Sequence, residues 1–468
     1  MILAHLIRQM AVVCGLLLLA MTAAAQTDTQ DADLMRIPQP PAQNATPLAP
    51  TTRGPGNQRI RLEDALTGWG NQALEVPPPG AQPTWQNRLS FDADVKFMAT
   101  QAVTVAVSDR LSAYGGDTIP SVTSANLEND LREVYVADEF LPRSYVEIGR
   151  VNLKEGLAYG WSPTDFFKPR TAVQISSLDP SIAREDRLGV VMIEAQRLFD
   201  SASLSAAFAP RLQGATAIPT SAPASFDPRW GRTNSDNRGL ITASWTGSML
   251  NPQLLAFFDR VGPHWGASVS HAFNASTVGY LEWSGTREAD LTARAIAFGI
   301  DTGAFTEAVA GTAGGSSTKH FANDLAAGTS WTTAFNLTLT LEYHYHQSGL
   351  TDAEFERIFS RGLSGPRGAS LFWYVQQYAA DQQEPFMTRE LFLRADWQDV
   401  IPSTLNLGGV AFVAQRDGSA LAQIYAHYFV SRSWTVSAYL GTTLGSTRSA
   451  FGDTPWRVSG IVQLLRYL

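Results

Sequence analysis

The chain of 468 residues contains a single cysteine, Cys14, and only four lysines. Cys14 lies in an N-terminal segment that we expect to be removed, so the mature chain would carry no thiol. The absence of thiols excludes disulfide bonds, cysteine zinc sites and a cysteine nucleophile. It also suits a protein that crosses an oxidising compartment such as the periplasm.

Long apolar runs are missing as well. Beyond Ala25 the sequence has no apolar stretch of about 18 residues, which excludes transmembrane helices. Hydrophobic residues make up 44% of the chain, and the mean hydropathy is -0.09. Glycine is nevertheless frequent at 37 residues, as are Trp at 12, Tyr at 13 and Phe at 23. This combination is typical of a membrane β-barrel, because only half of each strand faces lipid.

Signatures of catalysis and of nucleic-acid binding are absent too. The sequence has no Gly-x-Ser-x-Gly, His-Glu-x-x-His or phosphate-loop motif, so we expect neither an enzyme nor a cofactor. The formal net charge is -8, and no basic cluster interleaves with aromatic residues, which excludes nucleic acid as a partner. Nearly all basic residues are arginine. Biased codon usage is one explanation, and a pore lined by guanidinium groups is the other.

The N-terminal segment Met1–Ala25 has the three parts of an export signal. Arg8 supplies a positive charge, Met10–Met21 is apolar, and Ala23–Ala25 gives an Ala-x-Ala cleavage site. The alternative is an uncleaved membrane anchor. The apolar run is short for a span of about 20 residues, and a Pro-rich stretch follows, so we predict cleavage.

Residues 26–84 are rich in Pro, Gln, Thr and Ala, with extended or disordered stretches expected at Pro38–Pro50 and Pro77–Pro83. Between them, Arg61–Leu74 is expected to form a short helix, because three apolar side chains share one helical face. We interpret the whole segment as a periplasmic leader, which leaves room for a periplasmic partner.

The stretch Phe335–His346 shows the pattern that the rest of the chain repeats. Leu and Tyr occupy one parity of this stretch, whereas Asn, Thr, Glu and His occupy the other. Successive side chains of a strand point to opposite faces, so such a strand has one apolar face and one polar face. A soluble sandwich also alternates, but here the pattern recurs along residues 85–468. We predict an all-β fold for this region, a transmembrane antiparallel up-and-down β-barrel of about 16–18 strands.

Very short turns alternate with long polar loops along this region. In outer-membrane barrels the periplasmic turns are tight and the outer loops are long. The expected tight turns are Ala99–Gln101, Leu141–Ser144, Asp200–Ser201, Asn251–Pro252, Asn274–Ser276, Ala334–Asn336, Ile401–Ser403 and Ser431–Ser433. The expected long loops include Tyr114–Asn129, Gln213–Arg238, Arg287–Lys319 and Gln347–Gly368.

Tryptophans near the strand ends are candidates for the aromatic girdles at the two membrane surfaces. The chain closes on a strand-like segment, Trp456–Leu468. Gram-negative barrels resemble one another in a final strand with a terminal aromatic residue, which the barrel-assembly machinery reads; here Tyr467 is penultimate. We therefore expect a protein of the cell outer membrane, in contact with its lipid and lipopolysaccharide.

One loop carries a more specific motif. After the strand Tyr145–Val151 the chain has Gly149 and Arg150 at the strand end, and then Gly160-Trp161-Ser162-Pro163-Thr164-Asp165. This stretch resembles a broad group of porin-like outer-membrane proteins, which share a Gly-Arg strand end and a Trp/Gly-rich turn before a Ser-Pro-Thr-Asp type of segment. The resemblance implies a passive channel or export porin and identifies no solute.

The same loop concentrates charges of both signs. Our candidates for a pore constriction are Arg150, Lys154, Glu155, Trp161, Asp165, Lys168 and Arg170. Opposite charges that face one another across a pore create a strong local field. A salt-bridge network that only holds the loop down is the alternative, and a loop folded into or against the barrel can do both.

A second insert, Thr351–Gly362, is predicted to be a short loop helix with a Thr351/Glu354 capping box. Its apolar face is expected to pack on the barrel rim. Leu371–Ala379 fits either a strand or a helix. Glu342, His344 and His346 share one strand face, as metal ligands can, but such residues more often line a lumen, so we expect no metal site.

Two functions follow from these observations, and a third is weaker. The first is a porin-like channel for passive passage of small polar or anionic solutes. The alternative is an accessory outer-membrane component for export or assembly of a surface polymer, with the leader touching a periplasmic partner. A barrel enzyme ranks last, because no spacing of Ser, His and Asp favours a catalytic triad.

Overall fold

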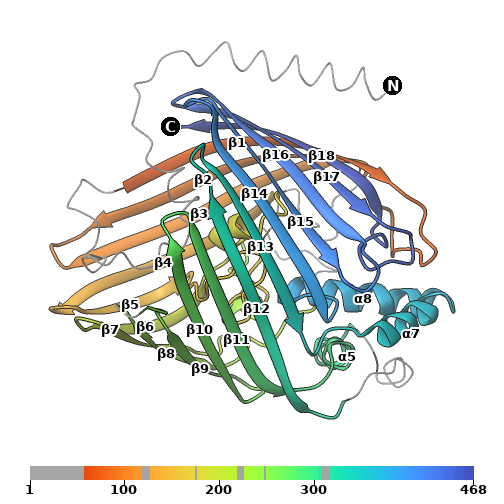
Figure 1. Cartoon of the computed structure of the whole chain (residues 1–468), viewed down its shortest axis with the longest axis horizontal. Coiled ribbons are helices and arrows are strands. Elements are labelled where there is room, and N and C mark those ends of the chain that lie inside the picture. Colours follow the sequence, from red (N-terminus) through yellow and green to blue (C-terminus); the bar gives the residue numbers. More distant parts are fainter. Residues whose placement is uncertain are drawn as a thin grey trace.

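The computed structural model describes residues 57–117, 127–173, 176–218, 226–246, 249–304, 306 and 317–468. The expected export signal and the first part of the leader lie outside these residues. Within them, 18 strands form one antiparallel sheet that closes on itself, because β1 (Asn57–Asn71) pairs with both β2 (Trp85–Met98) and β18 (Trp456–Tyr467). The predicted all-β barrel is confirmed, at the upper end of the expected strand number (Figure 1).

The remaining strands follow in chain order around the barrel. They are β3 (Val103–Gly116), β4 (Leu127–Leu141), β5 (Ser144–Val151), β6 (Val190–Leu198), β7 (Ala202–Ala209), β8 (Arg238–Trp245), β9 (Gln253–Phe258), β10 (Pro263–Asn274), β11 (Thr277–Glu288), β12 (His320–Thr332), β13 (Leu337–His346), β14 (Arg389–Ile401), β15 (Leu405–Ala414), β16 (Ala420–Ser431) and β17 (Trp434–Leu444).

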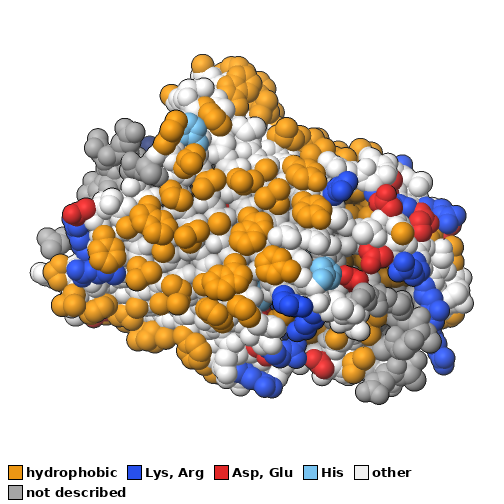
Figure 2. Space-filling model, turned by 60° about the horizontal axis from the view of Figure 1, so that its bottom comes forward, with side chains coloured by type: hydrophobic (Ala, Val, Ile, Leu, Met, Phe, Trp, Pro, Cys, Tyr) orange, Lys and Arg blue, Asp and Glu red, His pale blue; other side chains and the backbone are white. Residues whose placement is uncertain are grey.

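Strand alternation separates a polar lumen from an apolar outer wall. In β13, Glu342, His344 and His346 are buried inside the barrel, whereas Leu339 and Leu341 are 39% and 47% exposed on the outside. The same parity rule runs through the neighbouring strands, because antiparallel pairing keeps facing residues on one side of the sheet. Figure 2 shows the result on one outer face, where hydrophobic side chains cover the middle and charged side chains gather toward the ends.

The first strand differs from the sequence prediction. Arg61–Leu74 was expected to be a helix in a leader that ended at residue 84, but Asn57–Asn71 forms strand β1 and the barrel begins there. Two free strand edges supply hydrogen bonds along its whole length, while an isolated helix of this size is only marginally stable. Ion pairs inside the lumen fix the register, because Arg61 binds Asp92 and Arg88 binds Glu63.

The connections after even-numbered strands lie at one end of the barrel and are mostly short, whereas all the long connections lie at the other end, together with the short ones after β9 and β15. Seven of the eight expected tight turns are confirmed as the short connections after β2, β4, β6, β10, β12, β14 and β16, whereas the connection after β8, residues 246–252, is longer than the expected turn at Asn251–Pro252. We call the end with the long connections the loop end, and the first end the turn end. The wall has uneven height, because β5 to β9 have only 6 to 9 residues while β1 to β4 have 14 or 15.

Helices in the loops form a cap at the loop end (Figure 1). The predicted capping box is present in α7 (Asp352–Gly362), whose N-cap is Thr351. The ambiguous stretch Leu371–Ala379 lies in a helix, α8 (Pro366–Gln382), because its buried residues face α7 and α5 (Leu291–Asp301). Two shorter helices are α3 (Pro180–Glu185) and α4 (Trp230–Thr233). None of the helices in the described residues is long and apolar enough to cross a membrane.

The main cluster of buried hydrophobic side chains lies in this cap. Phe355 and Phe359 of α7 pack against Phe372 of α8, with ring centroids 6.4 Å and 5.6 Å apart. Val76, from the loop after β1, is fully buried among them, and its carbonyl accepts a hydrogen bond from the Trp373 indole N–H. The cap is therefore a small packed unit and not a set of loose loops.

Candidate functional site

The chain between β5 and β6 folds into the barrel over its described residues, 152–173 and 176–189, and we call these residues the insert. Two glutamates from the opposite wall hold its backbone. Glu282 of β11 accepts hydrogen bonds from the backbone N–H groups of Leu157 and Ala158. Glu342 of β13 accepts those of Tyr159 and Gly160, at 2.6 and 2.8 Å. Each carboxylate thus binds two successive amides, which fixes both the position and the direction of the insert.

The Ser-Pro-Thr-Asp segment completes this attachment. The hydroxyls of Ser162 and Thr164 each donate to Glu282 Oε2 at 2.8 Å. Gly160 is required beside them, because a Cβ there would lie 2.5 Å from the Phe392 ring. The sequence motif therefore has a structural explanation, since its small and hydroxylated residues fit against the inner wall.

Asp165 binds two arginine side chains of the insert. Its carboxylate accepts two hydrogen bonds from the Arg187 guanidinium, at 2.8 and 3.1 Å, and Arg184 lies 3.5 Å away. Burial alone would raise the pKa of Asp165, but the two guanidinium groups outweigh it and hold that pKa below its usual range. Asp165 is therefore an anion that ties the two arms of the insert together.

Three of the seven predicted constriction residues, Trp161, Asp165 and Lys168, line one cavity. Lys168 lies over the Trp161 ring, with its Nζ 5.0 Å from the ring centroid. The Trp161 ring meets His344 and His346 edge-on, with centroids 5.9 and 5.5 Å apart. These histidines are held by carboxylates, and no group of His, Cys, Asp and Glu in the described residues has the geometry of a metal site.

The other four predicted residues lie apart and attach the insert to its surroundings. Arg150 donates to the carbonyls of residues 189 and 228, at 2.9 and 2.8 Å. Lys154 pairs with a partly exposed glutamate of α3. Glu155 accepts a hydrogen bond from Gln253 at 2.9 Å, and Arg170 binds Asp381 of α8 at 2.8 Å. The structure therefore does not bring the seven candidates together in one ring.

The cavity lined by Trp161 and Lys168 opens toward the loop end, and we call it the loop-side chamber. It has a volume of about 500 Å³ and lies between the insert, the C-terminal half of α8 and the strands β14 to β16. Its lining combines charged groups of the insert with apolar groups such as Phe386, Phe412 and Phe451.

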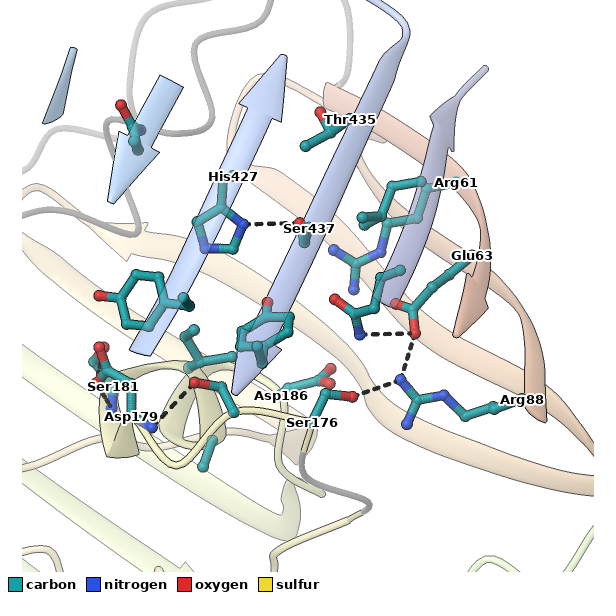
Figure 3. A pocket seen from close by; sticks show the side chains of 18 of the residues that line it. Arg61, Glu63, Arg88, Ser176, Asp179, Ser181, Asp186, His427, Thr435 and Ser437 are labelled. Carbon is teal, nitrogen blue, oxygen red and sulfur yellow. Dashed lines mark hydrogen bonds and ion pairs between the residues drawn. The ribbon is translucent and has the colours of Figure 1, made fainter. Parts of the chain in front are cut away.

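A second cavity of about 170 Å³ lies nearer the turn end, and we call it the turn-side chamber. Figure 3 shows residues that line it from β1 and β2, from the insert and from β16 and β17; they are Arg61, Glu63, Arg88, Asp179, Asp186 and His427. Its charges are paired. Arg110 and Arg132 both bind Asp186, and Arg110 also lies 3.0 Å from Asp92.

The two chambers meet at the start of α3. Ser177, Asp179 and Ala183 line both of them. Asp179 is the N-cap of α3 and accepts a hydrogen bond from the Ser181 N–H at 3.0 Å. Its other oxygen binds Arg394 of β14 at 2.8 Å, and both side chains are almost fully buried. This ion pair joins the insert to the barrel wall between the chambers.

Comparison with known proteins gives a fold and no family. No family model and no curated protein matches the sequence. Among solved structures, the chain is similar to Acinetobacter baumannii OccAB1 (11% identity, TM-score 0.51, 88% of this chain and 96% of that one). It is also similar to Pseudomonas aeruginosa OccK9 (12% identity, TM-score 0.51, 88% and 98%) and to a mutant of Rh. blastica porin (11% identity, TM-score 0.41, 88% and 100%). The chain has a porin fold. This porin-like barrel carries an inward insert and a helical cap.

The insert of this porin-like barrel contains two groups that titrate near neutral pH. Burial lowers the pKa of Lys168 to about 8, although Asp165 opposes the shift, and burial together with Asp165 raises the pKa of Glu155 to about 7. As pH rises, Glu155 gains negative charge and Lys168 then loses positive charge. Both changes make the lumen less favourable to anions.

We therefore expect the chloride-to-potassium permeability ratio to fall by about twofold between pH 6 and pH 9. Reversal potentials in a salt gradient measure this ratio. Lys168→Gln should remove the step near pH 8 and leave the step near pH 7, and Glu155→Gln should do the opposite. An unchanged pH profile in both variants would contradict the assignment.

Proposed function

We propose that this protein is an outer-membrane channel for passive passage of small polar or anionic solutes. The observation that carries the proposal is the pair of chambers in series, one toward each end of a closed barrel, with Ser177, Asp179 and Ala183 in both linings. The porin fold and the apolar outer wall support an outer-membrane location. The loop-side chamber, at about 500 Å³, has the size of a small-molecule site, and the turn-side chamber, at about 170 Å³, is smaller still, which favours small solutes over a polymer.

We propose that the contact between the insert and β14 is the constriction of this path, because Asp179 lines both chambers there. Here Asp179 and Arg394 form their ion pair, and Tyr159 lies against the Arg394 guanidinium at 5.7 Å. We propose that this contact, together with Trp161, Asp165 and Lys168 on its loop side, controls passage. Arg150, Lys154, Glu155 and Arg170 then act by holding the insert in place.

Replacing Arg394 with glutamine tests this path. The shorter neutral side chain cannot reach and pair with Asp179 in the same way, so the two chambers should connect more openly. We expect single-channel conductance in symmetric KCl to rise by about twofold, because a fixed charged barrier is removed. Arg448→Gln, which changes an exposed loop arginine outside both chambers, is the matched control and should leave conductance unchanged.

The wild-type protein tests whether the barrel conducts at all. After refolding in detergent and insertion into a planar bilayer, it should give discrete conductance steps. A folded, heat-stable barrel that never conducts would contradict the proposed function, regardless of how the variants behave.

A further inference from the structure

The loop-side chamber contains two carboxylates whose bonding is incomplete. Glu390 of β14 is 5% exposed and accepts a hydrogen bond from the Met387 backbone N–H, but it forms no ion pair with any other described residue. Glu384, just after α8, binds Arg294 through Oε2 at 3.1 Å, but its buried Oε1 has no hydrogen-bond partner among the described residues. Buried carboxylate oxygens normally have donors, and buried carboxylates are normally paired with a cation. Glu384 Oε1 therefore points to a missing donor, and Glu390 to a missing counter-charge.

Aromatic rings border the same chamber. Trp161, Phe386 and Phe412 line it, and the buried indole N–H of Trp161 has no partner in the described part of the chain. An ammonium group is attracted both by carboxylates and by the faces of aromatic rings. The combination of Glu384, Glu390 and the Phe386 and Phe412 rings is therefore suited to a compact cation with several N–H donors, whereas the Trp161 ring already holds Lys168 and its indole N–H needs an acceptor.

The insert contributes charge of the other sign. Arg184 and Lys168 line the chamber, and both share Asp165 with Arg187, so one carboxylate faces three cations. The chamber is thus bipolar, with excess positive charge on the insert and incompletely paired carboxylates in the segment from α8 to β14. Between them the lining is largely apolar, including Leu178, Phe451 and Leu421.

We propose that the loop-side chamber binds small zwitterions with an apolar body, an amino acid with an aromatic or branched side chain being the simplest. The ammonium group binds Glu390 and Glu384, and the carboxylate binds Arg184 and Lys168. This inference deepens the proposed channel function by naming a solute class. It also narrows the expectation of anionic solutes, because an anion alone would leave Glu390 buried without a counter-charge.

Three probes that share a phenyl ring separate the alternatives. Phenylalanine carries both charges, 3-phenylpropanoate only the carboxylate, and phenethylamine only the ammonium group. We expect the refolded wild-type protein to bind phenylalanine more tightly than either of the others in calorimetric titrations. Stronger binding of 3-phenylpropanoate or of phenethylamine than of phenylalanine would overturn the proposal.

Two variants show which residues bind the ammonium group and which bind the carboxylate of the ligand. Glu390→Gln should weaken phenylalanine binding by about tenfold, the effect of one lost charge-assisted hydrogen bond, and leave 3-phenylpropanoate unchanged. Lys168→Gln should weaken phenylalanine and 3-phenylpropanoate alike and leave phenethylamine unchanged. Glu75→Gln, which removes a loop carboxylate outside both chambers, is the matched control. If both chamber variants bind all three probes as the wild type does, the proposal is wrong.

Titrations on the detergent-folded protein do not require an open pore, so they decide this inference separately from the channel function. Conductance without selective phenylalanine binding would overturn the zwitterion site alone. Selective binding without conductance would support the site and contradict the channel. Heat-modifiable electrophoretic mobility of each variant shows that its barrel has folded.

Discussion

Replacing both Glu282 and Glu342 with glutamine is expected to raise single-channel conductance several-fold. These two carboxylates accept the four backbone N–H groups of residues 157–160, and Glu282 also accepts two hydroxyls. A neutral amide cannot accept all of these bonds, and each lost bond to a charged group costs about 1.5–3 kcal/mol. Residues 157–160 of the insert should then leave the wall and widen the lumen there. The two ends of the insert keep other attachments, such as the Asn152 N–H to Glu133 and the Leu178 N–H to Gln423.

Planar-bilayer recordings measure the conductance, and each single variant should show an intermediate rise. Glu147→Gln is the matched control, because Glu147 lies on the lumen-facing register of β5 opposite Glu194 and forms no hydrogen bond with the insert in the described residues. If the double variant folds and conducts like the wild type, the insert is held by other contacts and does not limit passage.

Replacing Asp381 with asparagine should release the helical cap from the insert. Asp381 of α8 binds Arg170 at 2.8 Å and Arg232 at 3.2 Å, and all three side chains are largely buried. Removing the acid leaves two buried guanidinium groups without their counter-charge. Breaking a buried ion pair in this way typically costs about 3–5 kcal/mol.

Limited trypsin digestion of the folded protein reports this release. Cleavage after Arg367, at the start of α8, should become much faster in the variant, while the barrel stays resistant. Asp352→Asn is the control, because Asp352 is an exposed residue of α7 and its replacement should not change the cleavage rate. Equal digestion of the Asp381 variant and the wild type would show that the apolar packing of the cap is sufficient to hold it.

Local signals in the sequence predicted most of the fold. The alternation in Phe335–His346, seven of the eight tight turns and the capping box of α7 each depend on residues close together in the chain. Strand β1 was missed because its fold depends on distant partners. Its helix-like apolar spacing and Pro-rich flanks carry no sign of the ion pair between Arg61 and Asp92, which sets its place in the sheet.

The site was predicted less completely for the same physical reason. Trp161, Asp165 and Lys168 lie in a motif rich in Gly, Trp and Pro, so the sequence marks them. Asp179 and Arg394 form their bond across 215 residues, and Ser162 reaches Glu282 across 120. Those contacts arise only when the barrel closes and places the insert against the far wall. The charged residues of the turn-side chamber could have been found from the sequence, because charged residues recur at the lumen-facing parity of the strands in 88–94, 110 and 128–132.

The uneven height of the barrel wall sets how the protein must sit in lipid. The strands β5 to β9 have 6 to 9 residues. A tilted strand of this length covers roughly 20 Å along the barrel axis, less than the apolar band of about 25 Å typical of such barrels. Acyl chains beside this sector must therefore compress, or the cylinder must lean toward it. Hydrophobic mismatch on one flank alone gives the molecule a preferred orientation and a preference for thin bilayers.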